Sequence, residues 1–478
     1  MASESNSPES RQGEEREDPG ILSGLDGFTD PAAGEGGSRR LWTAFWAAAD
    51  KGLPMLYGVA VVLIVVGRLE TAEFGIWVVF QTIFLAISLF GDYLLLQPMV
   101  KFSAEHEADA GPIITSGSLL YISCCLILAT PMSLFPEFFS GLLKTGEIGT
   151  SAFVWMVPTI GATILRNISI RILQIDLKIV SIFLLDLVYF GGFIALIILG
   201  WQSGTLDSTA DMISYNLYAL AASSIIGVIA CGRMIVPVFH NLGEAARKIV
   251  DVAHHQGGTG LMTIVQQNVD VMIVSGTRGS VAVGFYSIAR IFYRIYEALR
   301  EAGQLLLISA TSNAWSKNDE ERVQDLTILA TAALAAILYP MTIVLIILAP
   351  IGVEILISGG MIPSDYDQVI LPFQWLIASG FAMPFTIVTT SVLLGIGKTR
   401  DLFVGMAIGT SVMIVTGLIL TWMLGAQGMA IGVFLGNVTI ASILTARMNR
   451  SIDFSFGEVM KRGRGLGRDA RSRLRRRD

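Results

Sequence analysis

Gly67-Arg-Leu-Glu-Thr-Ala-Glu-Phe-Gly75-Ile-Trp77 follows an apolar run, and the pattern returns 209 positions later as Gly276-Thr-Arg-Gly-Ser-Val-Ala-Val-Gly284-Phe-Tyr286. Only the two glycines are identical, but each copy places a short polar, turn-like segment between two stretches of membrane-spanning length. The repeat predicts a transporter built from two similar halves. Such halves enclose a substrate path and expose it alternately to either side of the membrane by rocking against each other.

The composition is that of an integral membrane protein. Hydrophobic residues make up 53% of the 478 residues and charged residues only 15%, whereas an ordinary soluble domain carries about 25% charged residues. The formal net charge of -6 conceals two opposite tails, because acids gather in the first 40 residues and bases in the last 30. The three cysteines lie inside apolar runs without paired spacing, so we expect neither a disulfide nor a metal site.

The chain divides into four parts by composition. Residues 1–40 are acidic and rich in Ser, Gly and Pro, which predicts a disordered tail without the features of a signal peptide. Residues 41–240 and 241–447 are predicted to form an N-terminal and a C-terminal lobe of six helices each. Residues 448–478 form a basic tail, which either interacts with anionic headgroups or is simply solvated.

A spanning helix needs about 20 mostly apolar residues. Ten runs qualify by hydropathy: 44–66, 76–98, 112–134, 150–172, 178–200, 212–237, 325–349, 368–392, 401–424 and 428–446. The repeat adds two that carry polar residues at membrane depth, 255–276 and 281–308. The prediction is an all-α polytopic membrane protein of about twelve transmembrane helices, arranged as 6+6.

The distribution of lysine and arginine predicts the orientation, because cytoplasmic loops are enriched in both. With the N-terminus inside, the outer loops hold Arg68, Lys144 and Arg278, and the inner loops hold Lys101, Arg166, Arg171, Lys178, Arg233, Arg247, Lys248, Lys317, Arg322, Lys398 and Arg400. We therefore expect both termini in the cytoplasm. No outer loop is long enough for a catalytic domain and no phosphate-binding loop is present, so no enzymatic activity and no nucleic-acid partner are expected.

The eighth predicted helix carries one continuous polar stripe. Its members recur at spacings of four, three, four and three: Arg290, Arg294, Glu297, Glu301 and Gln304. A charge at bilayer depth costs about 2.5 kcal/mol or more, so the stripe must face a watery cavity or a partner. We expect it to line the gap between the halves, with Tyr286 and Tyr293 on or beside the same face.

Two interpretations of these arginines are open. Arg290 and Arg294 bind an anionic phosphate or pyrophosphate group through charge-assisted hydrogen bonds, or they form structural ion pairs within the helix. Glu297 and Glu301 are expected to tune or gate the arginines rather than to contact substrate.

The preceding helix carries Gln266 and Asp270 four residues apart on one face. Gln266 is a candidate cavity residue. Asp270 has two interpretations, either reversible binding of a proton or sodium ion that couples transport to a gradient, or a salt bridge to an arginine of the next helix.

The repeat relates the polar residues of the two halves. Adding 209 carries Gln81 onto Arg290 and Asp92 onto Glu301, so Gln81 is a candidate cavity residue and Asp92 a candidate gating residue. Because the first half lacks the positive charge, we expect the cations on the second half. Asp50 and Lys51 are expected at the inner end of the first helix, and Asp186 has no partner visible in the sequence.

Two segments at corresponding places in the halves resemble bacterial polysaccharide flippases. One is Glu73-Phe74-Gly75-Ile76-Trp77 with Phe90-Gly91-Asp92, and the other is Asn268-Val-Asp270 followed by Val283-Gly284-Phe285-Tyr286-Ser287. These flippases belong to the multidrug/oligosaccharidyl-lipid/polysaccharide exporter (MOP) superfamily, and the resemblance spans residues 42 to 447.

The resemblance implies a V-shaped bundle of two lobes in the bacterial inner membrane. It also implies a lipid-linked oligosaccharide on a polyprenyl pyrophosphate carrier as the substrate, moved between leaflets during lipopolysaccharide or exopolysaccharide synthesis without a cofactor. Its implied partners are membrane lipids and a polysaccharide polymerase or export machinery. Arg290 and Arg294 match the family's cationic cavity, whereas the first lobe lacks a mid-helix arginine. The alternatives are an ion-coupled multidrug antiporter of the same superfamily and a non-transporting scaffold for envelope assembly.

Overall fold

The computed structural model describes residues 46, 52–54, 56–58, 60–62, 64–105, 110–358, 364–452, 454, 457 and 459. Throughout these residues the regular structure is helical, and no strand occurs among them. Helices satisfy every backbone hydrogen bond within their own segment, which apolar stretches need where lipid offers no partners. The prediction of an all-α polytopic membrane protein is confirmed.

The first bundle begins with helical residues between Gly52 and Val65. Its other elements follow in chain order: α2 (Thr71–Gly91), η2 (Asp92–Leu96), α3 (Gln97–Glu105), α4 (Ala110–Leu134), α5 (Pro136–Leu142), α6 (Gly146–Val154), α7 (Met156–Ile175), α8 (Ile179–Asp186), η4 (Leu187–Gly191), α9 (Gly192–Ser203), α10 (Thr209–Cys231) and η5 (Gly232–Ile235). Both η2 and η4 are single π-helical turns inside otherwise continuous helices.

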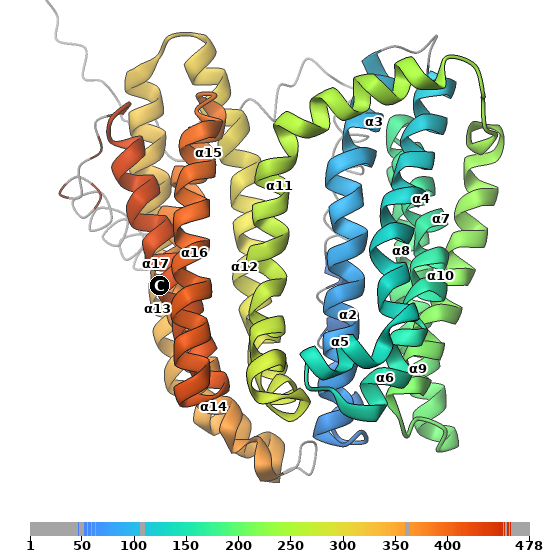
Figure 1. The fold of residues 1–478 in the computed structure, drawn as a ribbon. Coiled ribbons are helices and arrows are strands. Elements are labelled where there is room, and N and C mark those ends of the chain that lie inside the picture. The colour runs from blue at the N-terminus through green and yellow to red at the C-terminus, as the bar shows by residue number, and fades with distance from the viewer. Residues whose placement is uncertain are drawn as a thin grey trace, which may run out of the picture.

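The second bundle contains the longest helices. Its elements are α11 (Leu242–Arg278), α12 (Ser280–Ser316), α13 (Glu320–Ser358), η6 (Ser364–Val369), α14 (Ile370–Ala378), η7 (Ser379–Phe381), α15 (Met383–Gly395), α16 (Thr399–Leu424) and α17 (Ala426–Met448). Figure 1 shows α2–α10 and α12–α17 as two groups, with α11 between them. The first part of α11 runs across one end of the first group before the helix turns into the bundle.

Seven helices among the described residues are long and apolar enough to cross a membrane, and nine if each bent pair counts as one span. The two segments that the repeat predicted despite their polar residues, 255–276 and 281–308, lie within the longer α11 and α12. The count of twelve stays a prediction.

Two helix pairs are bent, and a proline lies beside the break in each. The α6–α7 pair is bent by 44°, and Pro158 follows the break. The α14–α15 pair is bent by 48°, and Pro384 is the second residue of α15. Proline lacks the N–H group that would continue the helical hydrogen bonding, so breaks occur at or before it.

The two bundles touch where α2 and α12 begin. A Cβ atom at Gly75 would overlap the carbonyl oxygen of Ser280, and a Cβ atom at Gly284 would lie 2.7 Å from the carbonyl oxygen of Thr71. Adding 209 carries Thr71 onto Ser280 and Gly75 onto Gly284, so the contact is related to itself by the repeat. Glycine is required because only a helix without a side chain at this position lets the partner backbone approach so closely.

Candidate functional site

A cavity of about 380 Å³ lies between the first helical segment, α2, α11 and α12. Its lining combines aromatic, small and polar side chains: Pro54, Tyr57, Gly58, Val61, Val62, Phe74, Trp77, Val78, Gln81, Thr82, Leu85, Leu89, Gln267, Asn268, Ser287, Arg290, Ile291, Arg294 and Glu297. Each half of the repeat therefore contributes one wall of the cavity. Gln81 and Arg290, which the repeat relates, both line it.

The cavity is closed at the end where α2 and α12 begin. Phe74 and Trp77 line it next to the Gly75 contact, and both side chains are buried by at least 98%. Two further bonds join the bundles at this end: Lys144 Nζ donates to the carbonyl of Thr277 at 2.9 Å, and Ser275 Oγ donates to the carbonyl of Leu143 at 2.5 Å. The lining continues away from this end as far as Leu89 and Glu297.

Arg290 lies on the cavity wall but is neutralised. Its Nε atom is 3.2 Å from Asp270 Oδ2, and its guanidinium also donates to the backbone carbonyl of Gln267. The exposed fractions of the Arg290 and Asp270 side chains are 14% and 5%. Of the two interpretations of Asp270, the salt bridge to the neighbouring helix is present in the structure, whereas ion coupling stays a prediction.

Tyr286 forms a hydrogen bond with the carboxylate of this ion pair. Its hydroxyl donates to Asp270 Oδ2 at 2.8 Å, and the backbone N–H of Val271 donates to Asp270 Oδ1 at 2.9 Å. Tyr286 is fully buried and is not part of the cavity lining. The expectation that Tyr286 faces the cavity is corrected, because the carboxylate of Asp270 holds its hydroxyl.

Arg294 differs from Arg290 in having no neutralising partner. Within the part of the chain that the structure describes, its side chain makes no hydrogen bond and no ion pair of the kind that holds Arg290. A methyl group at Gly58 would come within 3.4 Å of Arg294 Nη1, so the guanidinium lies against the first helical segment of the other half. An unpaired cation therefore spans the cavity from α12.

Other residues of the predicted site lie in a second, narrow pocket inside the second bundle. This pocket is lined by Gln266, Tyr293 and Glu297 together with Asp270 and Arg300. The Tyr293 hydroxyl accepts a hydrogen bond from Asn437 Nδ2 at 3.0 Å. Gln266 and Tyr293 are therefore away from the cavity between the bundles, and Glu297 lines both spaces.

The side chain of Glu301 lies outside the described residues, as do Asp50 and Lys51. In the first bundle, Asp92 is held by Arg171, whose Nε and Nη2 atoms donate to its two carboxylate oxygens at 2.7 and 2.5 Å. Asp92 does not line the cavity. Its predicted gating role stays a prediction.

The expectation that the first lobe lacks a mid-helix arginine is wrong. Arg166 lies in the middle of α7 rather than in an inner loop, and it forms an ion pair with Asp186, for which the sequence showed no partner. Its guanidinium also lies 4.7 Å from the centre of the Tyr189 ring. Both arginines of α7, Arg166 and Arg171, form ion pairs within their own bundle.

Gln81 completes the first bundle's share of the cavity. Its Oε1 atom is buried and has no hydrogen-bond partner among the described residues. It lies in the same cavity as Arg290 and Arg294. Sequence reasoning did not assign Tyr57, Trp77, Gln267 or Asn268 to the wall, although the run Gln266-Gln267-Asn268 at membrane depth was a usable signal for the last two.

A family model with the description "Polysaccharide biosynthesis protein" matches residues 65–360. The chain belongs to this family. Among curated protein sequences, none matches it. The predicted resemblance to polysaccharide flippases is thereby confirmed at the level of the family.

Solved structures with the same fold include two kinds of transporter. This member of the polysaccharide biosynthesis family is similar to the lipid II flippase MurJ in an inward closed conformation. The two chains are 15% identical with a TM-score of 0.71, and the match covers 88% of this chain and 89% of that one. It is similar to an inward-facing multidrug resistance MATE transporter of the MOP superfamily, with 14% identity, a TM-score of 0.70, and coverage of 85% and 98%. These likenesses show the fold of a MOP-superfamily transporter or flippase.

The TM-scores also differ between solved structures in different conformations. An outward-facing MATE transporter of the same superfamily, 16% identical and covering 84% of this chain and 93% of its own, gives a TM-score of 0.56. The inward-facing structures superpose better, at 0.70 and 0.71. This agrees with a cavity that is sealed by the contact between Gly75 and Ser280.

Proposed function

We propose that this protein is a flippase that moves a polyprenyl-pyrophosphate-linked oligosaccharide from the cytoplasmic to the periplasmic leaflet of the bacterial inner membrane, for the assembly of a surface polysaccharide. The observation that carries the proposal is Arg294, a cation in the cavity between two lobes that forms no ion pair or hydrogen bond with the described residues. Membership of the polysaccharide biosynthesis family and the fold shared with MurJ support it.

The chemistry of the cavity suits a pyrophosphate group. An unpaired guanidinium at membrane depth is costly, and an anion that enters the cavity removes this cost by forming charge-assisted hydrogen bonds. Arg290 lies one helical turn away and exchanges its bond to Asp270 for a bond to the anion. The aromatic rings of Tyr57, Phe74 and Trp77 provide faces against which sugar rings pack.

Alternating access then requires the sealed end to open. In the conformation described here the cavity is closed between Thr71–Gly75 and Ser280–Gly284, which the topology prediction places on the periplasmic side. The substrate enters from the cytoplasmic side, where both termini lie in this proposal. Rocking of the two bundles separates the glycine contact and releases the headgroup outside.

The test is a flipping assay in vesicles of defined composition that contain the purified protein and a fluorescent polyprenyl-pyrophosphate oligosaccharide. We expect Arg294→Gln to lower the flipping rate by about tenfold or more, the equivalent of at least one charge-assisted bond. Arg294→Lys should recover part of the rate, because the charge remains but the planar fork is lost.

Arg322→Gln is the matched control, because Arg322 is exposed at the start of α13 and does not line the cavity. Wild-type flipping by Arg294→Gln, at normal protein level, would refute the binding role. The outcome is read on transport of the headgroup itself, so it does not depend on which sugar the carrier bears.

Export of cationic drugs is the second candidate, favoured by the TM-score of 0.70 to an inward-facing multidrug MATE transporter. Arg294 opposes it, because an unpaired cation repels a cationic drug. Loss of the protein should trap carrier-linked oligosaccharide in the inner leaflet and reduce surface polysaccharide. Normal polysaccharide together with raised sensitivity to ethidium would instead establish drug export.

A further inference from the structure

A second cavity, of about 540 Å³, lies on the surface of the second bundle between α15 and α17. Its lining is almost entirely apolar or small: Phe381, Ala382, Phe385, Phe434, Val438, Ala441, Ser442, Thr445, Ala446, Asn449 and Phe454. None of these residues lines the cavity between the bundles. We call this feature the α15–α17 groove.

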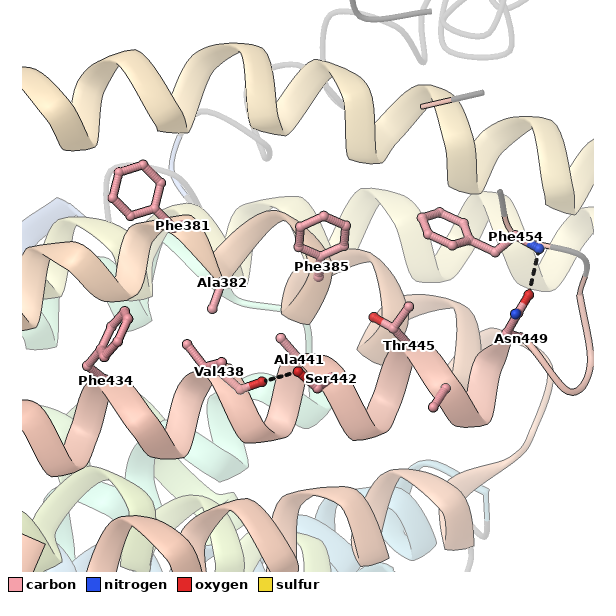
Figure 2. Close-up of a pocket in the computed structure, with 11 residues that line it drawn as sticks. Phe381, Ala382, Phe385, Phe434, Val438, Ala441, Ser442, Thr445, Asn449 and Phe454 are labelled. Carbon is pink, nitrogen blue, oxygen red and sulfur yellow. Dashed lines mark hydrogen bonds between the residues drawn. The ribbon is translucent and has the colours of Figure 1, made fainter. Parts of the chain in front are cut away.

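The break in the α14–α15 pair contributes one wall of the α15–α17 groove. Phe381 and Ala382 lie at the 48° bend, and Phe385 follows one turn later. Figure 2 shows these three residues on one side of the groove, with Phe434, Val438 and Ser442 of α17 on the other. The side chains of Phe381, Val438, Ser442 and Ala446 are exposed, so the groove opens toward the surroundings of the bundle.

The α15–α17 groove has the length of a lipid tail. Its α17 residues run from Phe434 to Asn449, which corresponds to about 22 Å at 1.5 Å per residue. One leaflet of hydrocarbon is about 15 Å deep, half of a core of roughly 30 Å. The groove is therefore long enough for one acyl chain, and at its far end, just past α17, the backbone N–H of Phe454 donates to Asn449 Oδ1 at 2.8 Å.

Two exposed basic residues, Lys398 and Arg450, lie near the far end of the α15–α17 groove. Lys398 Nζ lies 2.5 Å from Ser451 Oγ, and the exposed Arg450 follows Asn449 directly. Arg447 is already paired with Asp401. Beyond Phe454 the sequence carries nine further bases: Lys461, Arg462, Arg464, Arg468, Arg471, Arg473, Arg475, Arg476 and Arg477.

We propose that the α15–α17 groove is a binding site for an anionic phospholipid. One acyl chain occupies the groove, and the phosphate of the headgroup contacts Arg450 and Lys398. A neutral lipid lacks the charge that this end of α17 recognises. The α15–α17 groove shares no lining residue with the cavity between the bundles, so the two sites are separate.

The experiment measures lipid retained by the full-length protein. The purified protein is exchanged into mixed micelles containing phosphatidylglycerol or phosphatidylcholine with identical acyl chains, and bound lipid is counted by native mass spectrometry. We expect wild type to retain phosphatidylglycerol over phosphatidylcholine, and Ser442→Trp, which fills the groove, to abolish retention of both. Arg450→Gln should lower phosphatidylglycerol retention about fivefold, as removal of roughly 1 kcal/mol per basic residue implies, with phosphatidylcholine unchanged.

Matched controls separate the groove from the general lipid surface. Ser411→Trp changes an exposed serine of α16 that donates to a carbonyl four residues earlier at 2.8 Å, as Ser442 does. Arg322→Gln removes an exposed arginine elsewhere. Both should behave as wild type. If Ser442→Trp aggregates, Ala446→Phe one turn along α17 gives the same test with a smaller side chain.

Three outcomes would overturn the proposal. Unchanged retention in both Ser442→Trp and Ala446→Phe would show that the groove holds no acyl chain. Equal loss of both lipids in Arg450→Gln, or no loss, would reject recognition of the headgroup charge. A shift from dimer to monomer in Ser442→Trp without any change in bound lipid would identify a second copy of the chain as the occupant.

Discussion

The two halves of the chain are alike where they touch and unlike where they carry charge. At the contact, Thr71 and Gly75 of one half meet Ser280 and Gly284 of the other in equivalent roles. In the bundle interiors, both arginines of α7 are paired within the first half, whereas Arg294 of the second half is left unpaired in the cavity. In the function proposed above, the difference separates two tasks: the symmetric part closes the path, and the asymmetric part binds the substrate.

The largest effect on transport is expected from breaking the symmetric contact. In Gly75→Leu the side chain would overlap the backbone of Ser280, so α2 and α12 cannot meet and the cavity cannot be sealed. We expect flipping to fall by about tenfold or more, a loss equivalent to at least 1.4 kcal/mol. A disulfide between cysteines introduced at Thr71 and Ser280, in a background lacking native cysteines, should no longer form.

Gly284→Leu should behave like Gly75→Leu, because the repeat gives the two glycines the same role. Gly161→Leu is the control, since a Cβ atom there meets nothing within 4 Å. Normal cross-linking and flipping in Gly75→Leu would remove the contact from the transport cycle.

Charge pairing provides the next comparison. Arg166→Leu removes the ion pair that Arg166 forms with Asp186, whose side chain is only 14% exposed, and we expect a loss of about 3–5 kcal/mol in stability. Thermal unfolding of the purified protein measures it, and Arg166→Leu combined with Asp186→Leu should recover most of the loss. Arg294→Leu should be no less stable than wild type, because it removes a charge without a partner. A large destabilisation by Arg294→Leu would mean that this arginine is structural.

A smaller effect is expected from changing Asp270, which forms an ion pair with Arg290 on the cavity wall. Asp270→Asn removes the carboxylate that competes with an anion for Arg290, so binding of the carrier headgroup should tighten by about threefold to tenfold, equivalent to roughly 0.6–1.4 kcal/mol. Binding is measured by displacement of a fluorescent pyrophosphate carrier. If Asp270 instead couples transport to an ion gradient, Asp270→Asn binds as wild type but transports without responding to the gradient.

Topology reporters should leave transport unchanged. Single cysteines at Glu70 and Thr277 lie at the two repeat turns and should react with an impermeant maleimide from the periplasmic side of intact spheroplasts. A cysteine at Asn318, in the turn between α12 and α13, should react only after lysis. Labelling of the Asn318 cysteine in intact spheroplasts would reverse the orientation.

The fold was predictable because apolar length and the repeat are both written in the sequence. Hydropathy located most spans, and the repeat recovered α11 and α12, whose polar residues weaken their hydropathy. The extent of α11 was missed: it begins at Leu242, well before the expected 255, because its first part carries charges that hydropathy excludes from a span.

The candidate site was predictable only in part. The spacing of the α12 stripe identified Arg290, Arg294 and Glu297 as cavity residues. It could not show which arginine is neutralised, because Asp270 lies on a neighbouring helix twenty residues away in sequence. The Arg166–Asp186 pair was not predicted for the same reason, because helix periodicity identifies neighbours within one helix and not between two helices.

The contact at Gly75 and Gly284 also suits an origin of this chain from a smaller protein that formed a dimer. A six-helix ancestor with one such glycine would form the same contact twice in a homodimer, about a twofold axis along the membrane normal. In that dimer any substitution changes both sides of the cavity at once. Fusion into a single chain frees the halves to diverge, so that one half has two arginines in internal ion pairs while the other has Arg294 in the cavity, where we propose that it binds the substrate.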